Sequence, residues 1–270
     1  MVSKGLIGAL LMLEMCRGGL RRGRKGTGEM TRAAVRGFWG TLGWALALLG
    51  VMALVGFALV YGCAAFYGID PQQVPGAVNP ALLSSLASIM ALAPLCLVIA
   101  LAIRRVNRGF AEYLALRRPS RRHLAIGLCA ITALMVVVDV LARAMHWPVT
   151  SPILVEGIAR DRSAAMLALM ALSLTVTTPI GEELVFRGFI YRGFAASRLG
   201  VAGAVALSSL LFAVLHVQYD LIGLGEVLAS GLVLGTMRAV SGSTLLTIAM
   251  HALVNAVSLI EAVMAAGVSR

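Results

Sequence analysis

Two adjacent glutamates and an arginine lie inside an apolar stretch, residues 179–194, which reads PIGEELVFRGFIYRGF. Neighbouring residues on an α-helix point about 100° apart, so Glu182 and Glu183 face different directions. Glu183 and Arg187 are spaced i,i+4 and can form an ion pair on one face. The spacing therefore predicts a Glu183–Arg187 pair and leaves Glu182 unpaired by its own helix, as a general base would be.

The purely structural interpretation of this stretch is two acids at a solvated helix end, close to Arg187 and Arg192. Against it stands the cost of ionisable groups at membrane depth, roughly 2.5–3.5 kcal/mol each on insertion scales. Such residues are therefore candidates for function, and both interpretations stay open from this stretch alone.

Two further motifs follow later in the chain, FAVLH at residues 212–216 and HALVN at residues 251–255. A single histidine in an apolar helix is more often an interhelical hydrogen-bonding group. Converging helices can also gather four polar side chains around one cavity: Glu182, His216, His251 and Asn255. This set supplies a base, an imidazole that orients it and two donors for an oxyanion, which are the parts needed to add water to an amide carbonyl.

The elements that must position these residues are apolar segments long enough to cross a bilayer, which takes about 20 residues per helix. Seven candidates occur, at residues 38–62, 81–103, 123–144, 164–192, 200–217, 222–238 and 244–264. The sequence thus predicts an all-α, polytopic membrane helix bundle of about seven (six to eight) transmembrane helices. Segments 200–217 and 222–238 are the shortest.

Composition agrees with a membrane protein, since 60% of the 270 residues are hydrophobic and 13% are charged. The net charge of +11 is gathered in short stretches between apolar segments, which is typical of topology signals and not of nucleic-acid binding. Residues 17–36 and 104–122 each carry seven Lys or Arg, whereas residues 63–80 carry none. The positive-inside rule therefore predicts a cytoplasmic N-terminus and a cytoplasmic 104–122 loop.

EELVFR, FAVLH and HALVN together resemble the motifs EExxxR, FxxxH and HxxxN of the type II CAAX prenyl endopeptidase and bacteriocin-processing (CPBP) family of intramembrane proteases. The order of the three motifs also matches. The stretch EYLALRRPS, residues 112–120, resembles the basic segment that precedes an early helix in that family. The charge distribution predicts a basic cytoplasmic tail at 1–37 (with Met30 as an alternative start), and the apolar segments predict N-terminal transmembrane helices at 38–163. The resemblance implies a catalytic helix core at 164–264.

The resemblance also implies roles for the residues. Glu182 would activate the hydrolytic water with the help of His216, and His251 and Asn255 would stabilise the oxyanion. Glu183, Arg187 and Phe212 would support the site. The enzyme class implied is a CAAX-type intramembrane protease, classified among the metalloendopeptidases.

The sequence allows two hypotheses on whether the site binds a metal ion. We expect no cofactor, because HExxH is absent and the four cysteines, at positions 16, 63, 96 and 129, are too far apart in the sequence for a thiolate zinc motif. A zinc site needs three protein ligands, and Glu182, His216 and His251 could supply them.

The predicted substrate is a membrane-associated peptide or a lipidated protein, and the predicted location is a bacterial inner membrane. The alternative is a non-enzymatic membrane protein that uses the same polar cluster as a transport pathway or as part of a scaffold or immunity protein.

Overall fold

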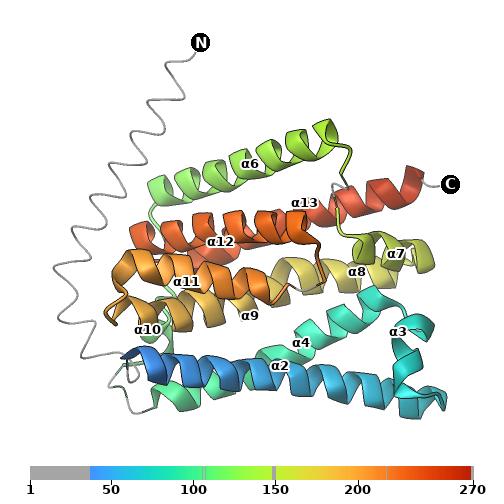
Figure 1. Cartoon of the computed structure of the whole chain (residues 1–270), viewed down its shortest axis with the longest axis horizontal. Coiled ribbons are helices and arrows are strands. Elements are labelled where there is room, and N and C mark those ends of the chain that lie inside the picture. The colour runs from blue at the N-terminus through green and yellow to red at the C-terminus, as the bar shows by residue number, and fades with distance from the viewer. Residues whose placement is uncertain (1–36, 105, 107, 148–149, 217, 269–270) are drawn as a thin grey trace. The chain divides into compact units, whose positions relative to one another are not determined.

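The computed structural model describes residues 37–104, 106, 108–147, 150–216 and 218–268. These residues form helices and loops, with no strand among them (Figure 1). The tail predicted at 1–37 falls outside the described residues except for Gly37, so it stays a prediction.

Six helical stretches of the described chain are long and apolar enough to cross a membrane: α2 (Gly37–Tyr67), α4 (Pro80–Ile103), α6 (Arg121–Ala144), Ala164–Ala195, α12 (Leu221–Ser241) and α13 (Thr244–Val268). A seventh apolar helix, α11 (Gly200–Val214), is about 22 Å long at ~1.5 Å per residue and so falls short of a ~30 Å hydrocarbon core. Each of the seven predicted segments therefore corresponds to a helical stretch, and the all-α membrane bundle is confirmed. Helices suit this setting because they satisfy their own backbone hydrogen bonds in lipid.

Shorter elements connect these helices: η1 (Pro71–Gln73), α3 (Val74–Ala77), α5 (Phe110–Tyr113) and α7 (Pro152–Arg160). Local residues set several of the helix ends. Asp220 caps the start of α12 by accepting a hydrogen bond from the Gly223 amide at 2.9 Å. Gly242 ends α12 with a φ of +66°, a left-handed conformation that glycine adopts without steric cost.

The described chain divides into two compact units, which are each described alone. The first comprises residues 37–43, 102–127 and 186–247, and the second comprises residues 44–101, 128–185 and 248–268. Five helical stretches of the described chain have residues in both units: α2, α4, α6, Ala164–Ala195 and α13.

Helices α11 and α12 lie side by side in the first unit (Figure 1). Glycines at positions 231 and 235 of α12 allow this approach. A β-carbon at Gly231 would lie 3.1 Å from Ser209 Cβ, and one at Gly235 would lie 3.1 Å from Val205 Cγ1. The small residues thus bring two helix backbones together, as is typical of membrane helix pairs.

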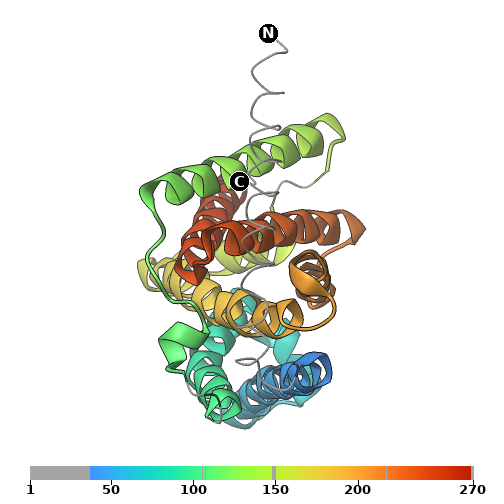
Figure 2. The ribbon, with the colours of Figure 1, turned by 90° about the vertical axis from the view of Figure 1, so that its left-hand side faces the viewer.

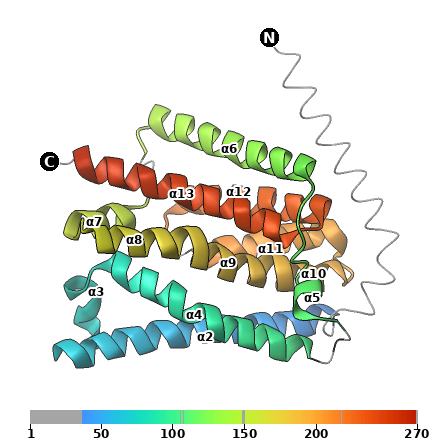
Figure 3. The ribbon, with the colours of Figure 1, turned by 180° about the vertical axis from the view of Figure 1, so that it is seen from behind.

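The second unit packs around two apolar clusters. One joins α4, α7, α8 (Ala164–Leu172) and α13 through Ala81, Ile158, Met166, Met170 and Ala262. The other packs the end of α2 against α3 and the start of α4, and α2 and α4 are adjacent in all three views (Figures 1, 2 and 3).

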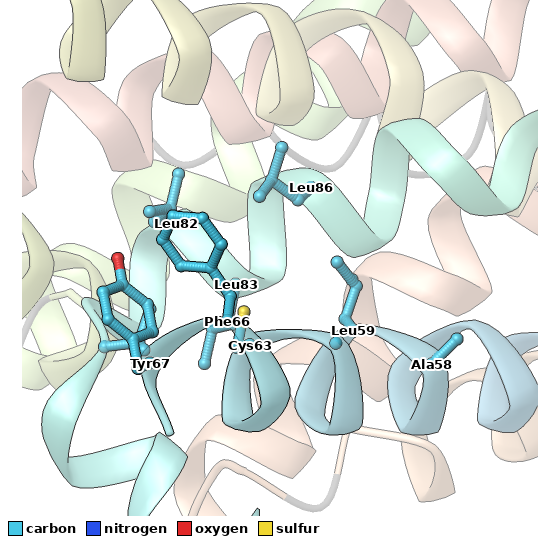
Figure 4. Close-up of a pocket in the computed structure, with 10 residues that line it drawn as sticks. Ala58, Leu59, Cys63, Phe66, Tyr67, Leu82, Leu83 and Leu86 are labelled. Carbon is cyan, nitrogen blue, oxygen red and sulfur yellow. The ribbon is translucent and has the colours of Figure 1, made fainter. Parts of the chain in front are cut away.

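An apolar pocket lies between α2 and α4 in the second unit (Figure 4). Its lining residues are Ala58, Leu59, Gly62, Cys63, Phe66, Tyr67, Val78, Leu82, Leu83 and Leu86. No carboxylate or imidazole is among them, so this pocket has apolar surface to offer but no group for acid–base chemistry.

Candidate active site

The predicted glutamates lie on an irregular helix. The stretch Ala164–Ala195 contains two π-helical segments, η2 (Ser173–Thr177) and η3 (Leu184–Ile190), on either side of α9 (Thr178–Glu183). Such wide turns are frequent at functional sites. Pro179 gives a local reason for η2, since its ring would clash with the carbonyl of residue 175 in a regular α-helix.

A set of hydroxyl groups fixes this irregular turn against α4 within the second unit. Ser88 Oγ lies 2.9 Å from Thr177 Oγ1 and 2.7 Å from Thr178 Oγ1. One turn earlier on both helices, Ser173 Oγ donates to Ser85 Oγ at 2.9 Å. Because Thr178 precedes Glu182 by one turn, these bonds hold the helix immediately before the predicted base.

His251 of α13 lies between the two glutamates. Its Nδ1 is 3.0 Å from Glu183 Oε1, and its Nε2 is 3.8 Å from Glu182 Oε2. Glu183 is completely buried, whereas the Glu182 side chain keeps 21% of its surface exposed. The contact with Glu183 is a hydrogen bond, and the contact with Glu182 is a longer ion-pair contact. The exposed fractions make Glu182 the more accessible of the two acids.

Glu182 Oε2 makes no hydrogen bond to any residue that the structure describes. This oxygen is itself buried, and it lies 3.8 Å from His251 Nε2. A water molecule about 2.8 Å from each of the two atoms would bridge them, which requires the side chains around Oε2 to make room for it.

The contact with Glu183 also fixes the proton on His251. An ionised carboxylate only accepts hydrogen bonds, so Nδ1 must carry the hydrogen. Nε2 is then a lone pair in the neutral ring or an N–H donor in the imidazolium. A carboxylate that orients a histidine in this way is equally suited to presenting Nε2 to water or to a metal ion.

Asn255 lies one turn after His251 on α13. Its Nδ2 donates a hydrogen bond to the backbone carbonyl of Leu174, in η2, at 2.8 Å. This bond engages one of the two amide hydrogens. The oxyanion role of Asn255 stays a prediction.

His216 lies in the first unit, two residues beyond the end of α11. The prediction that its segment continues to residue 217 is wrong in this detail, because the helix ends at Val214. Its Nδ1 lies 2.8 Å from the Phe212 carbonyl, which can only accept, so Nδ1 carries the hydrogen, and in the neutral ring Nε2 is a lone pair. The ring lies beside Phe212, with centroids 4.6 Å apart.

Arg187, also in the first unit, is completely buried. Its Nη2 donates to the Gly231 carbonyl at 3.2 Å, and its guanidinium lies 4.5 Å from the centre of the Phe212 ring. Phe212 thus supports an arginine as well as a histidine, a cation–π contact that agrees with its predicted supporting place. The predicted Glu183–Arg187 ion pair stays a prediction, and η3 begins between the two residues, so regular α-helical spacing does not apply there.

Two residues that hydrogen-bond Arg187 were not predicted from the sequence. Gly231 supplies the carbonyl that Arg187 bonds, and Arg238 Nε donates to the carbonyl of Arg187 itself at 3.0 Å. Arg238 is the last residue of the predicted segment 222–238, and its charge within an apolar run was the signal available.

Of the three possible zinc ligands, Glu182 and His251 belong to the second unit and His216 to the first. Among the described residues, no group of three His, Cys, Asp or Glu side chains is arranged to hold a metal ion. The choice between a metal-free site and a zinc site is therefore left to chemical analysis.

Comparison with known proteins bears directly on this part of the chain. Residues 164–257 match the family model described as Type II CAAX prenyl endopeptidase Rce1-like. The predicted family resemblance is confirmed. The Rce1-like segment contains all the predicted site residues, from Glu182 to Asn255.

A curated relative with a similar sequence is an uncharacterized 24.3 kDa protein of Escherichia coli. It is 32% identical over 124 residues, which cover 45% of this chain and 56% of that protein. The chain thus spans little more than half the length of that relative. No solved structure matches the chain.

Proposed function

We propose that the protein is an intramembrane endopeptidase that hydrolyses a peptide bond in a membrane-associated peptide or a lipidated protein. The observation that carries the proposal is the placement of Glu182 Oε2 3.8 Å from His251 Nε2, with Glu183 bonded to the other ring nitrogen. Both residues lie on helices long and apolar enough to cross a membrane, Ala164–Ala195 and α13, and the segment that holds them is Rce1-like.

In this proposal Glu182 acts as the general base. Its carboxylate takes a proton from water while the water oxygen attacks the carbonyl carbon of the substrate. Collapse of the tetrahedral intermediate breaks the C–N bond, and Glu182 returns the proton to the leaving nitrogen. The role is supported by the partial exposure of the Glu182 side chain, and by its Oε2, which is buried but makes no hydrogen bond to a described residue.

His251 and Asn255 are proposed to stabilise the oxyanion. The Glu183 carboxylate balances the charge of a protonated His251, whose Nε2–H then points away from Glu183. Asn255 has one amide hydrogen beyond the one that it gives to Leu174. Donors already fixed by other bonds need little reorganisation when negative charge develops.

His216 is proposed to assist Glu182 on the strength of its motif, and the lone pair on Nε2 is compatible with that role. Glu183 and Arg187 are proposed as supporting residues. If the reaction uses zinc, Glu182, His216 and His251 are the residues proposed to hold it, and the metal would polarise the water.

The location proposed is a bacterial inner membrane, with the N-terminus and the 104–122 loop in the cytoplasm, from the distribution of Lys and Arg. The competing function is a membrane scaffold or transport pathway built on the same cluster.

Replacement of Glu182 by aspartate separates the two functions. A general base displaced by one methylene should lose most of its activity, whereas a scaffold should tolerate the change. Comparison of membranes from cells that carry the wild type or Glu182→Ala should reveal peptides that accumulate only in the variant. Identical peptide profiles together with unchanged binding of a partner protein would favour the scaffold.

A further inference from the structure

The basic stretch EYLALRRPS is fixed firmly to the first unit. The Thr244 amide and hydroxyl donate to the carbonyls of Ala115, at 3.0 Å, and Leu114, at 2.6 Å. The Arg117 Nε donates to the Gly242 carbonyl at 2.7 Å. These bonds tie the residues after α5 to the turn between α12 and α13.

Three arginines meet at this place, each held by a backbone carbonyl. Arg117 bonds Gly242, Arg192 bonds the Tyr113 carbonyl at 2.6 Å, and Arg238 bonds the Arg187 carbonyl at 3.0 Å. An aromatic ring also holds Arg192 in place, because its guanidinium lies 4.5 Å from the centre of the Tyr113 ring. We call Arg117, Arg192 and Arg238 the arginine cluster.

Within the described part of this unit, the three positive charges of the arginine cluster have one carboxylate acting on them, that of Glu112 on Arg192. Arg238 is only 7% exposed, and the guanidinium groups that act on it are those of Arg117 and Arg192. The Nε of Arg192 is buried and bonds no described residue. A guanidinium carries five N–H donors, so each member has donors left over.

The unit has three described acids, and they are too few or too distant to balance the cluster. Glu112 acts on Arg192 but is also paired with Arg108 at 2.7 Å. Asp220 and Glu226 lie at the far end of α12, about 27 Å and 18 Å from Arg238 along the helix axis. A group of buried or fixed cations that shares a single acid is electrostatically costly unless an anion binds there.

The position of the cluster indicates which anion would bind. Residues 104–120 join the membrane-spanning helices α4 and α6, so the cluster lies where these helices leave the bilayer. Four exposed arginines extend the positive surface along this connection: Arg104, Arg118, Arg121 and Arg122. Lipid phosphates are the anions present at that depth in a membrane, and basic pockets between transmembrane helices bind them.

We propose that the arginine cluster is a binding site for the phosphate of an anionic glycerophospholipid. The fixed guanidinium forks suit a phosphate group, which they can contact through paired N–H donors. The proposal does not depend on the activity of the proposed hydrolytic residues.

Thermal unfolding of the purified full chain in a neutral detergent tests the site. Dioctanoyl phosphatidylglycerol should raise the Tm by several degrees, and dioctanoyl phosphatidylcholine or inorganic phosphate at the same concentration should not. Arg117→Gln, at an exposed position, should raise the phosphatidylglycerol concentration that gives half of the full Tm shift by about fivefold. Arg238→Gln should do the same if it folds.

The matched control is Arg143→Gln, an exposed arginine at the other end of α6, which should leave the phosphatidylglycerol response unchanged. Equal Tm shifts with phosphatidylcholine, or with inorganic phosphate alone, would overturn the assignment to an anionic lipid. An Arg117→Gln response equal to that of the wild type would overturn the assignment to this cluster.

Discussion

His251 Nδ1 lies 3.0 Å from Glu183 Oε1, and both side chains are buried. This hydrogen bond fixes which ring nitrogen carries the proton and turns Nε2 toward Glu182. The two adjacent acids therefore act on one imidazole, Glu183 by orienting it and Glu182 by sharing its free side.

Glu183→Gln should lower the turnover number of peptide cleavage by about 10- to 100-fold, the usual cost of losing a carboxylate that orients a histidine. The amide has nearly the same shape but no charge, so KM should change little while kcat falls. Steady-state kinetics in detergent or liposomes measure both constants. Glu156→Gln on α7, where the glutamate pairs with Arg160 at the surface, is the control and should behave as wild type. Equal kcat values for wild type and Glu183→Gln would exclude this role.

Ser88→Ala should destabilise the protein by about 1–3 kcal/mol, because the part-buried hydroxyls of Thr177 and Thr178 lose their shared partner. Thermal unfolding in detergent reports the change as a lower Tm. Ser84→Ala on the same helix removes an exposed hydroxyl that bonds only its own helix, at Ala81, and should leave the Tm nearly unchanged. The same Tm for the two variants would argue against the hydroxyl bonds as a brace for η2.

Gly231→Ala should lower both stability and activity, because the new methyl group would lie 3.1 Å from Ser209 Cβ and 3.4 Å from Arg187 Nη2. Gly225→Ala, earlier on α12, meets no atom within 4 Å and should be neutral or stabilising by up to about 1 kcal/mol. Parallel measurement of Tm and cleavage rate separates the two. A Gly231→Ala variant as stable and active as Gly225→Ala would contradict the close packing of α11 on α12 around Arg187.

Much of this molecule is predictable from its sequence, because lipid imposes helices on long apolar segments and the three motifs identify the polar residues. The two π-helical segments could not be predicted. Residue spacing is interpreted with the 3.6 residues per turn of a regular α-helix, and a π-helix has wider turns. The Glu183–Arg187 argument depends on the α-helical repeat and crosses the start of η3.

The position of His251 between Glu182 and Glu183 also could not be predicted from the sequence. Adjacent residues on a helix face different ways, which suggested separate tasks for the two acids. An imidazole has two nitrogens that point in different directions, so one ring from α13 reaches both. His216 shows a further limit, because the apolar run FAVL gives no sign that the helix ends before the histidine.

Metal content can be measured directly. We expect active, purified protein to contain no stoichiometric zinc and to keep its turnover number after dialysis against a chelator, since Glu182 can activate water without a metal. Inductively coupled plasma mass spectrometry and a cleavage assay give the two readings. Bound zinc in a one-to-one ratio, with activity lost on chelation and restored by zinc, would instead assign Glu182, His216 and His251 as ligands.

The most direct test of the account is the cleavage rate of Glu182→Gln in purified, reconstituted protein that keeps the wild-type Tm. Glutamine preserves the size of the side chain but cannot take a proton from water. General-base catalysis contributes about 100- to 10,000-fold, so the account predicts a loss of turnover of at least that order. A Glu182→Gln enzyme that cleaves as fast as the wild type would contradict it.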